Sequence, residues 1–138
     1  MFSGEHQQVD KVQTMLEKIK GLDFPVKFSS YGNLTIVSGE KKLLANLKTI
    51  VTTSVNQRVM RPTYGVPSED LLFSKIQSIS TLEIKSDIIE SISLFEPRVV
   101  LTYVDVKRKD IESTFYIDIG FKPNALGYQS EVTFNIVV

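Results

Sequence analysis

Several kinds of functional site are excluded by residues that this sequence lacks. Its 138 residues include no cysteine and one histidine, His6, close to the start of the chain. Without cysteine the chain can form no disulfide, thiolate nucleophile or thiolate-bound metal centre, which fits a protein made in a reducing cytoplasm. A single histidine argues against a histidine-based triad or zinc cluster. We therefore expect no metal and no cofactor.

The chain also lacks an excess of charge of one sign. Sixteen basic and sixteen acidic residues cancel, and no segment holds a dense basic run. The electrostatic signature of a nucleic-acid or membrane-surface protein is therefore absent. No stretch of about 18 apolar residues occurs, and the N-terminus has no basic region followed by an apolar run, so the sequence predicts neither a membrane span nor a signal peptide. If the chain binds a partner, we expect that partner to be a protein.

Apolar residues at helical spacing predict three helices. The first covers about residues 7–20, the second 40–55, and the third begins at a Ser-x-x-Glu capping box, Ser80 to Glu83, and ends before Pro97. Their apolar positions are Val9, Val12, Leu16 and Ile19; Leu43, Leu44, Leu47, Ile50, Val51 and Val55; and Ile84, Ile88, Ile89, Ile92 and Phe95. We expect the first helix to pack on its own domain, with a detachable terminal arm as the alternative. Residues 22–37 are rich in turn-forming residues and predict an extended strap.

After Arg98 the apolar pattern changes to a period of two, which predicts strands. The alternating positions are Val100, Thr102, Val104 and Val106; Phe115, Ile117, Ile119 and Phe121, after a polar turn at 107–112; and Val132, Phe134, Ile136 and Val138. We predict an α+β fold of two layers, in which helices cover one face of a small, mostly antiparallel sheet. The expected division is an N-terminal helical arm, residues 1–21, and one domain, residues 22–138. The last strand is either the third strand of this sheet or an open edge that exchanges strands between subunits.

Glu96, Pro97 and Arg98 place two opposite charges at the junction between the third helix and the strands. Pro97 ends the helix and favours an extended conformation for the residue before it. In an extended segment alternate side chains point the same way, so we expect Glu96 and Arg98 to lie side by side. This arrangement is typical of a recognition element.

A loop over residues 56–67 offers partners for these charges. It contains Arg58, Arg61, Tyr64 and Gly65 together with two prolines, a mixture that predicts an ordered loop. In one interpretation Arg58 or Arg61 pairs with Glu96 and fastens the loop to the helix end. In the other, the arginines of the loop join Glu96 and Arg98 in a mixed-charge surface that binds another subunit. The two interpretations are compatible.

The sequence gives little support to catalysis, and we expect no catalytic residue. A glycoside hydrolase needs two carboxyl groups, one with a raised pKa. Glu96 is the acid in the most suggestive place, but Arg98 beside it should lower its pKa, which does not suit a general acid. A lysozyme-like peptidoglycan hydrolase is the alternative from another class, and a free-standing protein-binding adaptor is a third.

The order of these features resembles the gene-25-like baseplate wedge proteins of contractile phage tails, which have relatives in type VI secretion and tailocins. The resemblance spans about residues 22–121. The features that carry it are Tyr31-Gly32-Asn33, the apolar helix from Leu43 to Val51, the loop from Gln57 to Gly65 with Leu71-Leu72-Phe73 after it, the Ile-rich helix and Glu96-Pro97-Arg98.

The resemblance implies a non-enzymatic structural protein of the virion tail baseplate, assembled in the host cytoplasm. It implies one copy per wedge in a six-fold ring, bound to other wedge proteins and their core bundle through Glu96, Pro97 and Arg98, with Arg58, Tyr64 and Gly65 in a supporting loop. It also implies a sheath initiator that offers strands to the first ring of the tail sheath. The edge argument, and not the resemblance, suggests Val132 to Val138 as the strand that faces the sheath.

Overall fold

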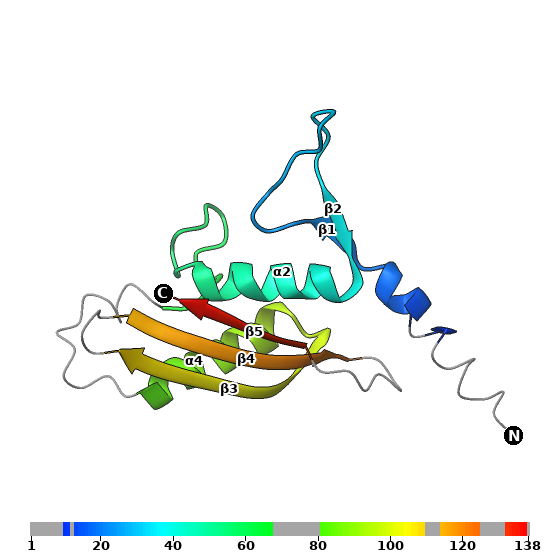
Figure 1. The fold of residues 1–138 in the computed structure, drawn as a ribbon. Helices are drawn as coiled ribbons and strands as arrows, with labels where there is room; N and C mark the ends of the chain where they lie inside the picture. Colours follow the sequence, from blue (N-terminus) through cyan, green and yellow to red (C-terminus); the bar gives the residue numbers. More distant parts are fainter. Residues whose placement is uncertain (1–9, 12, 68–80, 110–113, 125–131, 138) are drawn as a thin grey trace, which may run out of the picture.

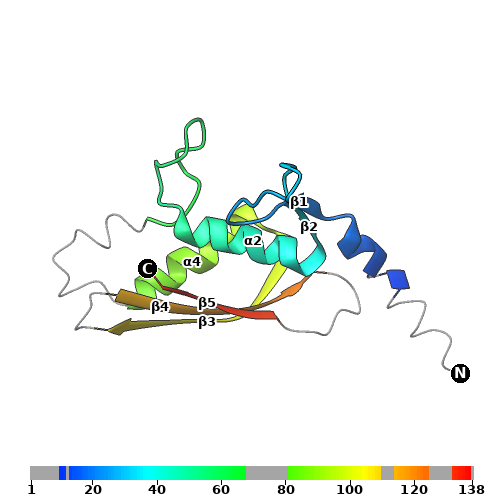
Figure 2. The same ribbon diagram turned by 45° about the horizontal axis from the view of Figure 1, so that its top comes forward.

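Two helices, α2 and α4, cover one face of a three-stranded antiparallel sheet, and a two-stranded ribbon stands beyond them (Figures 1 and 2). The computed structural model describes residues 10–11, 13–67, 81–109, 114–124 and 132–137. The elements in chain order are β1 Lys20–Leu22, β2 Ile36–Ser38, α2 Gly39–Thr52, α4 Thr81–Phe95, β3 Val99–Lys109, β4 Thr114–Pro123 and β5 Val132–Val137. The predicted two-layer α+β fold is confirmed.

The three predicted helices are present, but two of them end earlier than expected. The first gives way to β1, which begins at Lys20, and the second, α2, ends at Thr52 because Thr53 is extended, so that Val55 lies beyond it. Residues 10–11 and 13–17 are helical, and the chain then turns into β1. Leu16 from this segment is buried in the core and Ile19 packs against it, so the described part of the N-terminal helix lies on its own domain, as expected. The predicted capping residue Ser80, the apolar residues 71–73, Val9 and Val12 lie outside the described residues. None of the helices in the described ranges combines the length and the apolar character of a membrane span.

The core lies between the two helices and the inner face of the sheet. Apolar residues three or four positions apart place one stripe of each helix against the strands, and alternate residues of β4 face that stripe. The largest fully buried side chains are Leu43, Leu47, Ile50, Ile88, Ile92, Ile119 and Phe121. Ile89, which we expected on the buried face of α4, is exposed. It lies about 100° around the helix from Ile88 and therefore outside the stripe formed by every fourth residue.

A β-bulge in β3 changes which residues face the core. Leu101 pairs with Phe121 but Tyr103 pairs with Gly120, so β3 carries one extra residue at this point. An extra residue reverses the alternation of side chains across a strand. Val99 is buried before the bulge and Val104 after it. The prediction that Val100 and Thr102 share the inner face with Val104 and Val106 is therefore wrong, and both are exposed.

The β3–β4 hairpin is longer than the sequence suggested. Lys107, Arg108 and Lys109, which we expected in a polar turn, belong to β3 and pair with Tyr116, Phe115 and Thr114. Residues 110–113 of the expected turn lie outside the described residues.

Strand β5 is the third strand of the domain's own sheet. It pairs antiparallel with β4 in the order β3-β4-β5, so β5 forms one edge of this sheet. Ile136 is buried, and the ring of Phe134 meets that of Phe121 edge-on at a centroid distance of 6.1 Å. Val138 and the side chain of Val132 lie outside the described residues.

Replacing Phe121 by alanine should lower the free energy of unfolding by about 3–5 kcal/mol, because the change removes a fully buried ring from between sheet and helices. Urea denaturation measures the change. Leu94→Ala, at an exposed position of α4, is the matched control and should stay within about 0.5 kcal/mol of the wild type. Equal losses in the two variants would contradict the assigned core.

Candidate partner-binding site at the end of helix α4

Helix α4 ends in a tight turn that carries the Glu96-Pro97-Arg98 triplet. The Glu96 N–H still donates to the Ile92 carbonyl at 2.8 Å, but Pro97 has no N–H with which to continue the helix. The Val99 N–H then donates to the Glu96 carbonyl at 3.2 Å and closes the turn over Pro97 and Arg98. The triplet is therefore a turn and not the extended segment that we predicted, although its two charged side chains still meet.

The carboxylate of Glu96 is almost fully enclosed and has three hydrogen bonds. Arg98 donates from Nε to Oε1 at 2.6 Å and from Nη2 to Oε2 at 2.9 Å, which makes a two-point ion pair. Asn46, from helix α2, donates from Nδ2 to Oε2 at 2.7 Å. Glu96 is 2% exposed, whereas the Arg98 side chain is 51% exposed. Glu96 therefore points into its own chain and Arg98 lies at the surface above it.

These contacts decide the protonation state of the pair. Burial by itself raises the pKa of Glu96, but the hydrogen bonds from Arg98 and Asn46 and the charge of Arg98 outweigh it, so that the pKa lies below its ordinary value. The hydrogen bond to Glu96 raises the pKa of Arg98 in turn. Both groups are charged at neutral pH. A glutamate held as a carboxylate in this way does not suit the role of general acid.

The loop arginines do not form the predicted staple to Glu96. The guanidinium of Arg58 instead lies over the ring of Tyr64, 4.6 Å from its centroid. That ring in turn contacts the ring of Phe95, the last residue of α4, at a centroid distance of 4.8 Å. The loop is therefore fastened to the helix end by contacts among Arg58, Tyr64 and Phe95, and Phe95 directly precedes Glu96.

Gly65 is needed where the loop returns to the domain. Its φ of +109° is a backbone conformation that glycine adopts readily and other residues rarely do, and a side chain here would collide with the Thr53 carbonyl. On the two sides of this point, the Val66 N–H donates to the Thr53 carbonyl at 2.9 Å and the hydroxyl of Ser91 donates to the Gly65 carbonyl at 2.9 Å. The base of the loop is therefore held tightly against α4.

Two apolar side chains are presented at the tip of this loop. Val59 and Met60 are 93% and 94% exposed, although both are apolar, and Arg58 and Arg61 flank them. The Asn56 N–H donates to the Pro62 carbonyl at 2.7 Å and closes the tip. Exposed apolar side chains between arginines on an ordered loop are typical of protein interfaces.

Sequence reasoning found most of these residues but missed some contacts. Asn46 was overlooked, although a polar residue beside Leu43 and Leu47 on the apolar side of a helix indicates a buried polar partner. Val59 and Met60 belong to the predicted loop, but the exposure of their side chains could not be read from the sequence. The structure brings Arg58, Tyr64 and Gly65 together at the end of α4. In the terminal strand, the side chains of Phe134 and Ile136, which we predicted to face the sheath, pack toward the core.

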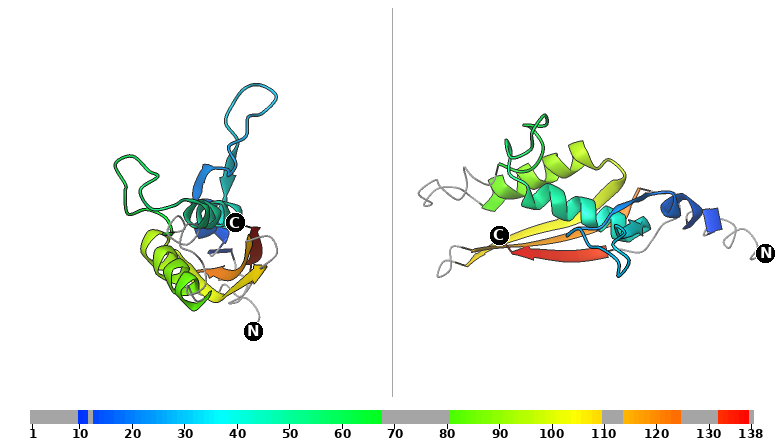
Figure 3. Two further views of the ribbon diagram at one scale, coloured as in Figure 1. Left: turned by 90° about the vertical axis from the view of Figure 1, so that its left-hand side faces the viewer. Right: turned by 90° about the horizontal axis from the view of Figure 1, so that it is seen from above.

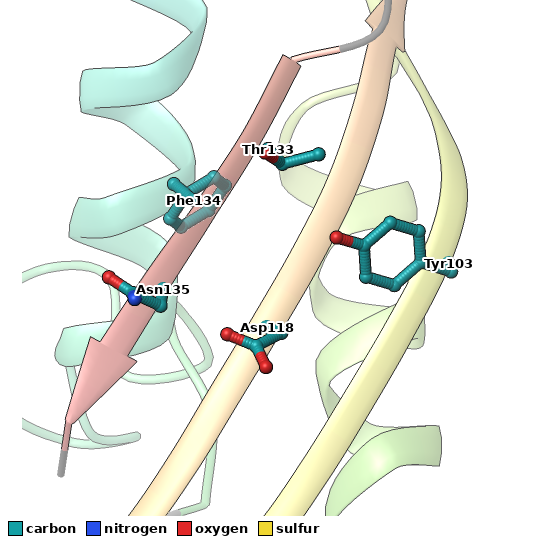
Figure 4. Close-up of a pocket in the computed structure, with 5 residues that line it drawn as sticks. All are labelled: Tyr103, Asp118, Thr133, Phe134 and Asn135. Atoms are coloured by element: carbon teal, nitrogen blue, oxygen red, sulfur yellow. The ribbon is translucent and has the colours of Figure 1, made fainter.

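A shallow pocket lies on the sheet face that the helices leave uncovered (Figure 4). Its volume is about 220 Å³, and its lining residues are Tyr103, Asp118, Thr133, Phe134 and Asn135. This is smaller than the range of roughly 300–1,000 Å³ that is usual for ligand sites. In the part of the chain that the structure describes, no three His, Cys, Asp or Glu residues gather in a way that could hold a metal ion.

A family model described as baseplate wedge protein gp25 matches residues 37–125. The chain belongs to this family. The match includes Glu96-Pro97-Arg98 and the loop from Thr53 to Val66, so the whole candidate site lies within the part that defines the gp25 wedge family. The match leaves out most of the β1–β2 ribbon and all of β5.

Several solved structures are similar to this wedge-family chain, and two of them illustrate the likeness. One is from a cryo-EM structure of the anti-feeding prophage (AFP) baseplate, six-fold symmetrised, with 22% identity, a TM-score of 0.62 and coverage of 89% of this chain and 88% of that chain. At that identity the likeness shows a shared fold. The other is a crystal structure of a Geobacter sulfurreducens protein provisionally described as a tail lysozyme, with 28% identity, a TM-score of 0.57 and coverage of 75% and 91%. A comparison with curated proteins gave no match.

Replacing Glu96 by glutamine should lower stability at neutral pH by about 1–3 kcal/mol, because a charged acceptor of three hydrogen bonds is lost. The pKa of Glu96 is depressed in the folded state, so its stabilisation is present above its ordinary pKa of 4.5 and is lost as the pH falls through the lower, folded-state value. When the pH is lowered below about 4.5, the free energy of unfolding should therefore fall less in the variant than in the wild type.

Urea denaturation of both proteins, from neutral pH down to about pH 3, tests this difference. Glu90→Gln, at an exposed position in the middle of α4, is the matched control and should stay within about 0.5 kcal/mol of the wild type at neutral pH. Parallel profiles for Glu96→Gln and the wild type would show that the pair does not stabilise the fold in this way.

Proposed function

We propose that this protein is a structural component of the inner baseplate of a contractile injection machine, where it binds other wedge proteins and starts the polymerisation of the tail sheath. Membership of the gp25 wedge family is the observation that carries the proposal, and it supports a baseplate role for the chain as a whole. The surfaces described above supply candidates for each of the two contacts.

The contact with the wedge proteins and their core bundle is assigned to the end of α4 and the loop beside it. Because the Glu96 carboxylate is enclosed, a partner would not meet it directly; Glu96 acts as a positioning residue that fixes the exposed Arg98. The partner would meet Arg98, Arg61 and the apolar tip. Val59 and Met60 would become buried on binding, and apolar side chains with arginines around them are a favourable composition for such an interface.

The contact with the sheath is assigned to strand β5. It is an edge strand, and edges of sheets accept strands from other chains. Thr133, Asn135 and Val137 are exposed, while Phe134 and Ile136 hold the strand to its own core. A sheath strand would therefore add to the outer edge of β5, which has no strand neighbour among the described residues, without removing β5 from the domain.

The remaining parts of the proposal concern the setting. We propose six copies around the tube, one for each wedge, in the baseplate of a virion tail or a related machine, assembled in the host cytoplasm. The AFP baseplate, whose chain has this fold, was symmetrised six-fold, which is in keeping with that number.

Peptidoglycan hydrolysis is the alternative, because a similar structure is provisionally described as a tail lysozyme. The site geometry does not favour it. Glu96 is enclosed and held as a carboxylate by Arg98 and Asn46, and the pocket at Asp118 is smaller than is usual even for small ligands. Release of fragments from purified peptidoglycan by the wild type, abolished in Glu96→Gln, would establish the hydrolase instead.

For the wedge contact, we expect the double variant Val59→Asp, Met60→Asp to remain folded, because both side chains are almost fully exposed, and to lose roughly tenfold or more of its incorporation into baseplates. Quantitative mass spectrometry of purified particles measures incorporation. Leu82→Asp, at another exposed apolar position, is the matched control and should be incorporated normally. Equal incorporation of both variants would remove the loop tip from the interface; a folded wild-type chain absent from particles would favour a free-standing adaptor.

For the sheath contact, the double variant Thr133→Lys, Val137→Lys should allow baseplates to form but leave them without sheath, because lysines along an edge strand oppose strand addition. Electron microscopy of particles distinguishes the two stages of assembly. Tyr103→Lys places a lysine on β3, at the opposite edge of the sheet, and should leave the sheath intact. Normal sheaths on the double variant would contradict the role of β5.

A further inference from the structure

The β1–β2 ribbon is a projecting arm that stands away from the sheet (Figures 1 and 3). Its two strands pair antiparallel from Lys20↔Ser38 to Leu22↔Ile36, and an isolated bridge joins Phe28 to Leu34 further out. Almost all of the arm precedes residue 37, where the match to the wedge family begins. The contacts assigned above to the wedge proteins and the sheath do not use it.

One face of this arm is apolar and exposed. Leu22 and Ile36 are opposite each other, as are Phe28 and Leu34. Leu34 and Ile36 are two residues apart on one extended segment, so the two pairs lie on the same face. Phe28 and Ile36 are 68% and 67% exposed. Single exposed apolar residues are common on protein surfaces, but four adjoining ones form a patch, and such a patch indicates an interaction surface.

The opposite face holds the arm in place. Gly21 and Val37 form the pair next to Leu22 and Ile36, on the side nearer the domain, and their face of the ribbon is turned toward helix α2. The Lys42 ammonium donates to the Leu22 carbonyl at 2.9 Å, and a side chain at Gly21 would collide with Lys42. The outer edge of β1 is therefore contacted by Lys42 of α2, so that, within the part of the chain that the structure describes, the edge of β2 is the more open of the two.

The hydrogen-bond pattern fixes which backbone groups this edge presents. The Asp23 N–H donates to the Thr35 carbonyl at 3.4 Å and the Gly39 N–H to the Ile19 carbonyl at 2.9 Å. In an antiparallel ladder the bonded pairs alternate with pairs whose backbone groups point outward. The bonded positions are therefore Thr35, Val37 and Gly39, and Ile36, which lies between the first two, directs its N–H and C=O away from β1.

Leu34 follows the same rule further along the arm. The Thr35 N–H donates to the Lys27 carbonyl at 2.9 Å and the Ser29 N–H to the Asn33 carbonyl at 2.7 Å, so the pair between them, Phe28 and Leu34, has outward backbone groups. The edge of β2 thus offers donor and acceptor groups at every second residue, on the strand whose side chains form the apolar face. Among the described residues β2 has one strand neighbour, β1.

A groove runs beside the inner end of this edge. Its volume is about 550 Å³, and Ile36 and Ser38 line it together with Gln13 and Glu17 from the N-terminal helical segment and Lys41 from α2. Space therefore exists next to the backbone groups of β2 for an extended chain.

We propose that the edge of β2 binds an extended segment of another baseplate protein, which adds to the arm as a third strand. The backbone groups of Leu34 and Ile36 would pair with that strand, and apolar residues at every second position of it would cover the exposed face of the arm. A strand fits better than a helix, because the backbone groups of a helix bond within the helix and cannot satisfy a sheet edge. This inference rests on the proposed baseplate function, because it takes its partner from the baseplate.

The test replaces Ile36 by proline in the full-length chain. Proline removes the outward N–H and leaves the bonds between β1 and β2 intact, so the protein should keep its melting temperature. Incorporation into particles should fall roughly tenfold or more, because a hydrogen bond is lost and the ring stands where the added strand would lie. Ile36→Val keeps the N–H and is the matched control, which should be incorporated like the wild type.

A second variant and a direct observation complete the test. Leu34→Lys, Ile36→Lys keeps the whole backbone but charges the edge, and should lose incorporation as the proline variant does. Cryo-EM of wild-type particles should show a strand of another protein beside β2. Full incorporation of both variants, or a β2 edge that faces solvent, a helix, the same chain or a second copy of it in the particle, would overturn the inference.

This outcome is distinguishable from failure of the proposed function. If the wild-type chain is present in particles and Val59→Asp, Met60→Asp is excluded while the Ile36 variants are not, the baseplate function stands and the arm inference falls. If the wild-type chain is absent from particles, both fall.

Discussion

The buried carboxylate of Glu96 joins helix α2 to the junction between α4 and β3, 50 residues away in the sequence. Its partners are Asn46 on α2 and Arg98 at the entrance to β3, and it stands itself at the end of α4. A charge removed from water is tolerated when its hydrogen-bonding capacity is filled, and loss of one partner is costly because the other remains buried. The crossing of the two helices and the point where the chain enters the sheet therefore depend on the same three hydrogen bonds.

The loop between residues 53 and 67 depends on that arrangement through Phe95. The ring of Tyr64 packs against that of Phe95 at a tilt, Arg58 lies over Tyr64, and Gly65 is fixed to α4 by Ser91. Such a loop has little conformational freedom left to lose when it meets a partner, which lowers the entropic cost of binding. The apolar tip is thus presented by a pre-ordered support.

Much of the fold follows from periodicity. The helical stripes of Leu43, Leu47, Ile88 and Ile92 and the alternation of Ile117, Ile119 and Phe121 predicted the two layers, because burial of these faces is the dominant energy of the fold. The bulge at Leu101–Tyr103 was not predictable, since a one-residue insertion leaves no mark on composition. At the site, the spacing of Glu96 and Arg98 predicted that their side chains lie close together. That Glu96 bonds to Arg98 and Asn46, and not to Arg58, depends on tertiary geometry that the local sequence does not carry.

The bulge in β3 also decides which residue follows the charged turn into the core. Val104 and Val106 point inward, and an unbroken alternation back from them would turn Val100 inward and Val99 outward. The bulge absorbs the additional residue, so that Val99 enters the core directly after the exposed Arg98. A strand without Thr102 would keep Val99 and Val104 on the inner face, because a regular alternation across the deletion has the same parity. One surplus residue absorbed in a strand thus lets the core and a surface charge be encoded next to each other.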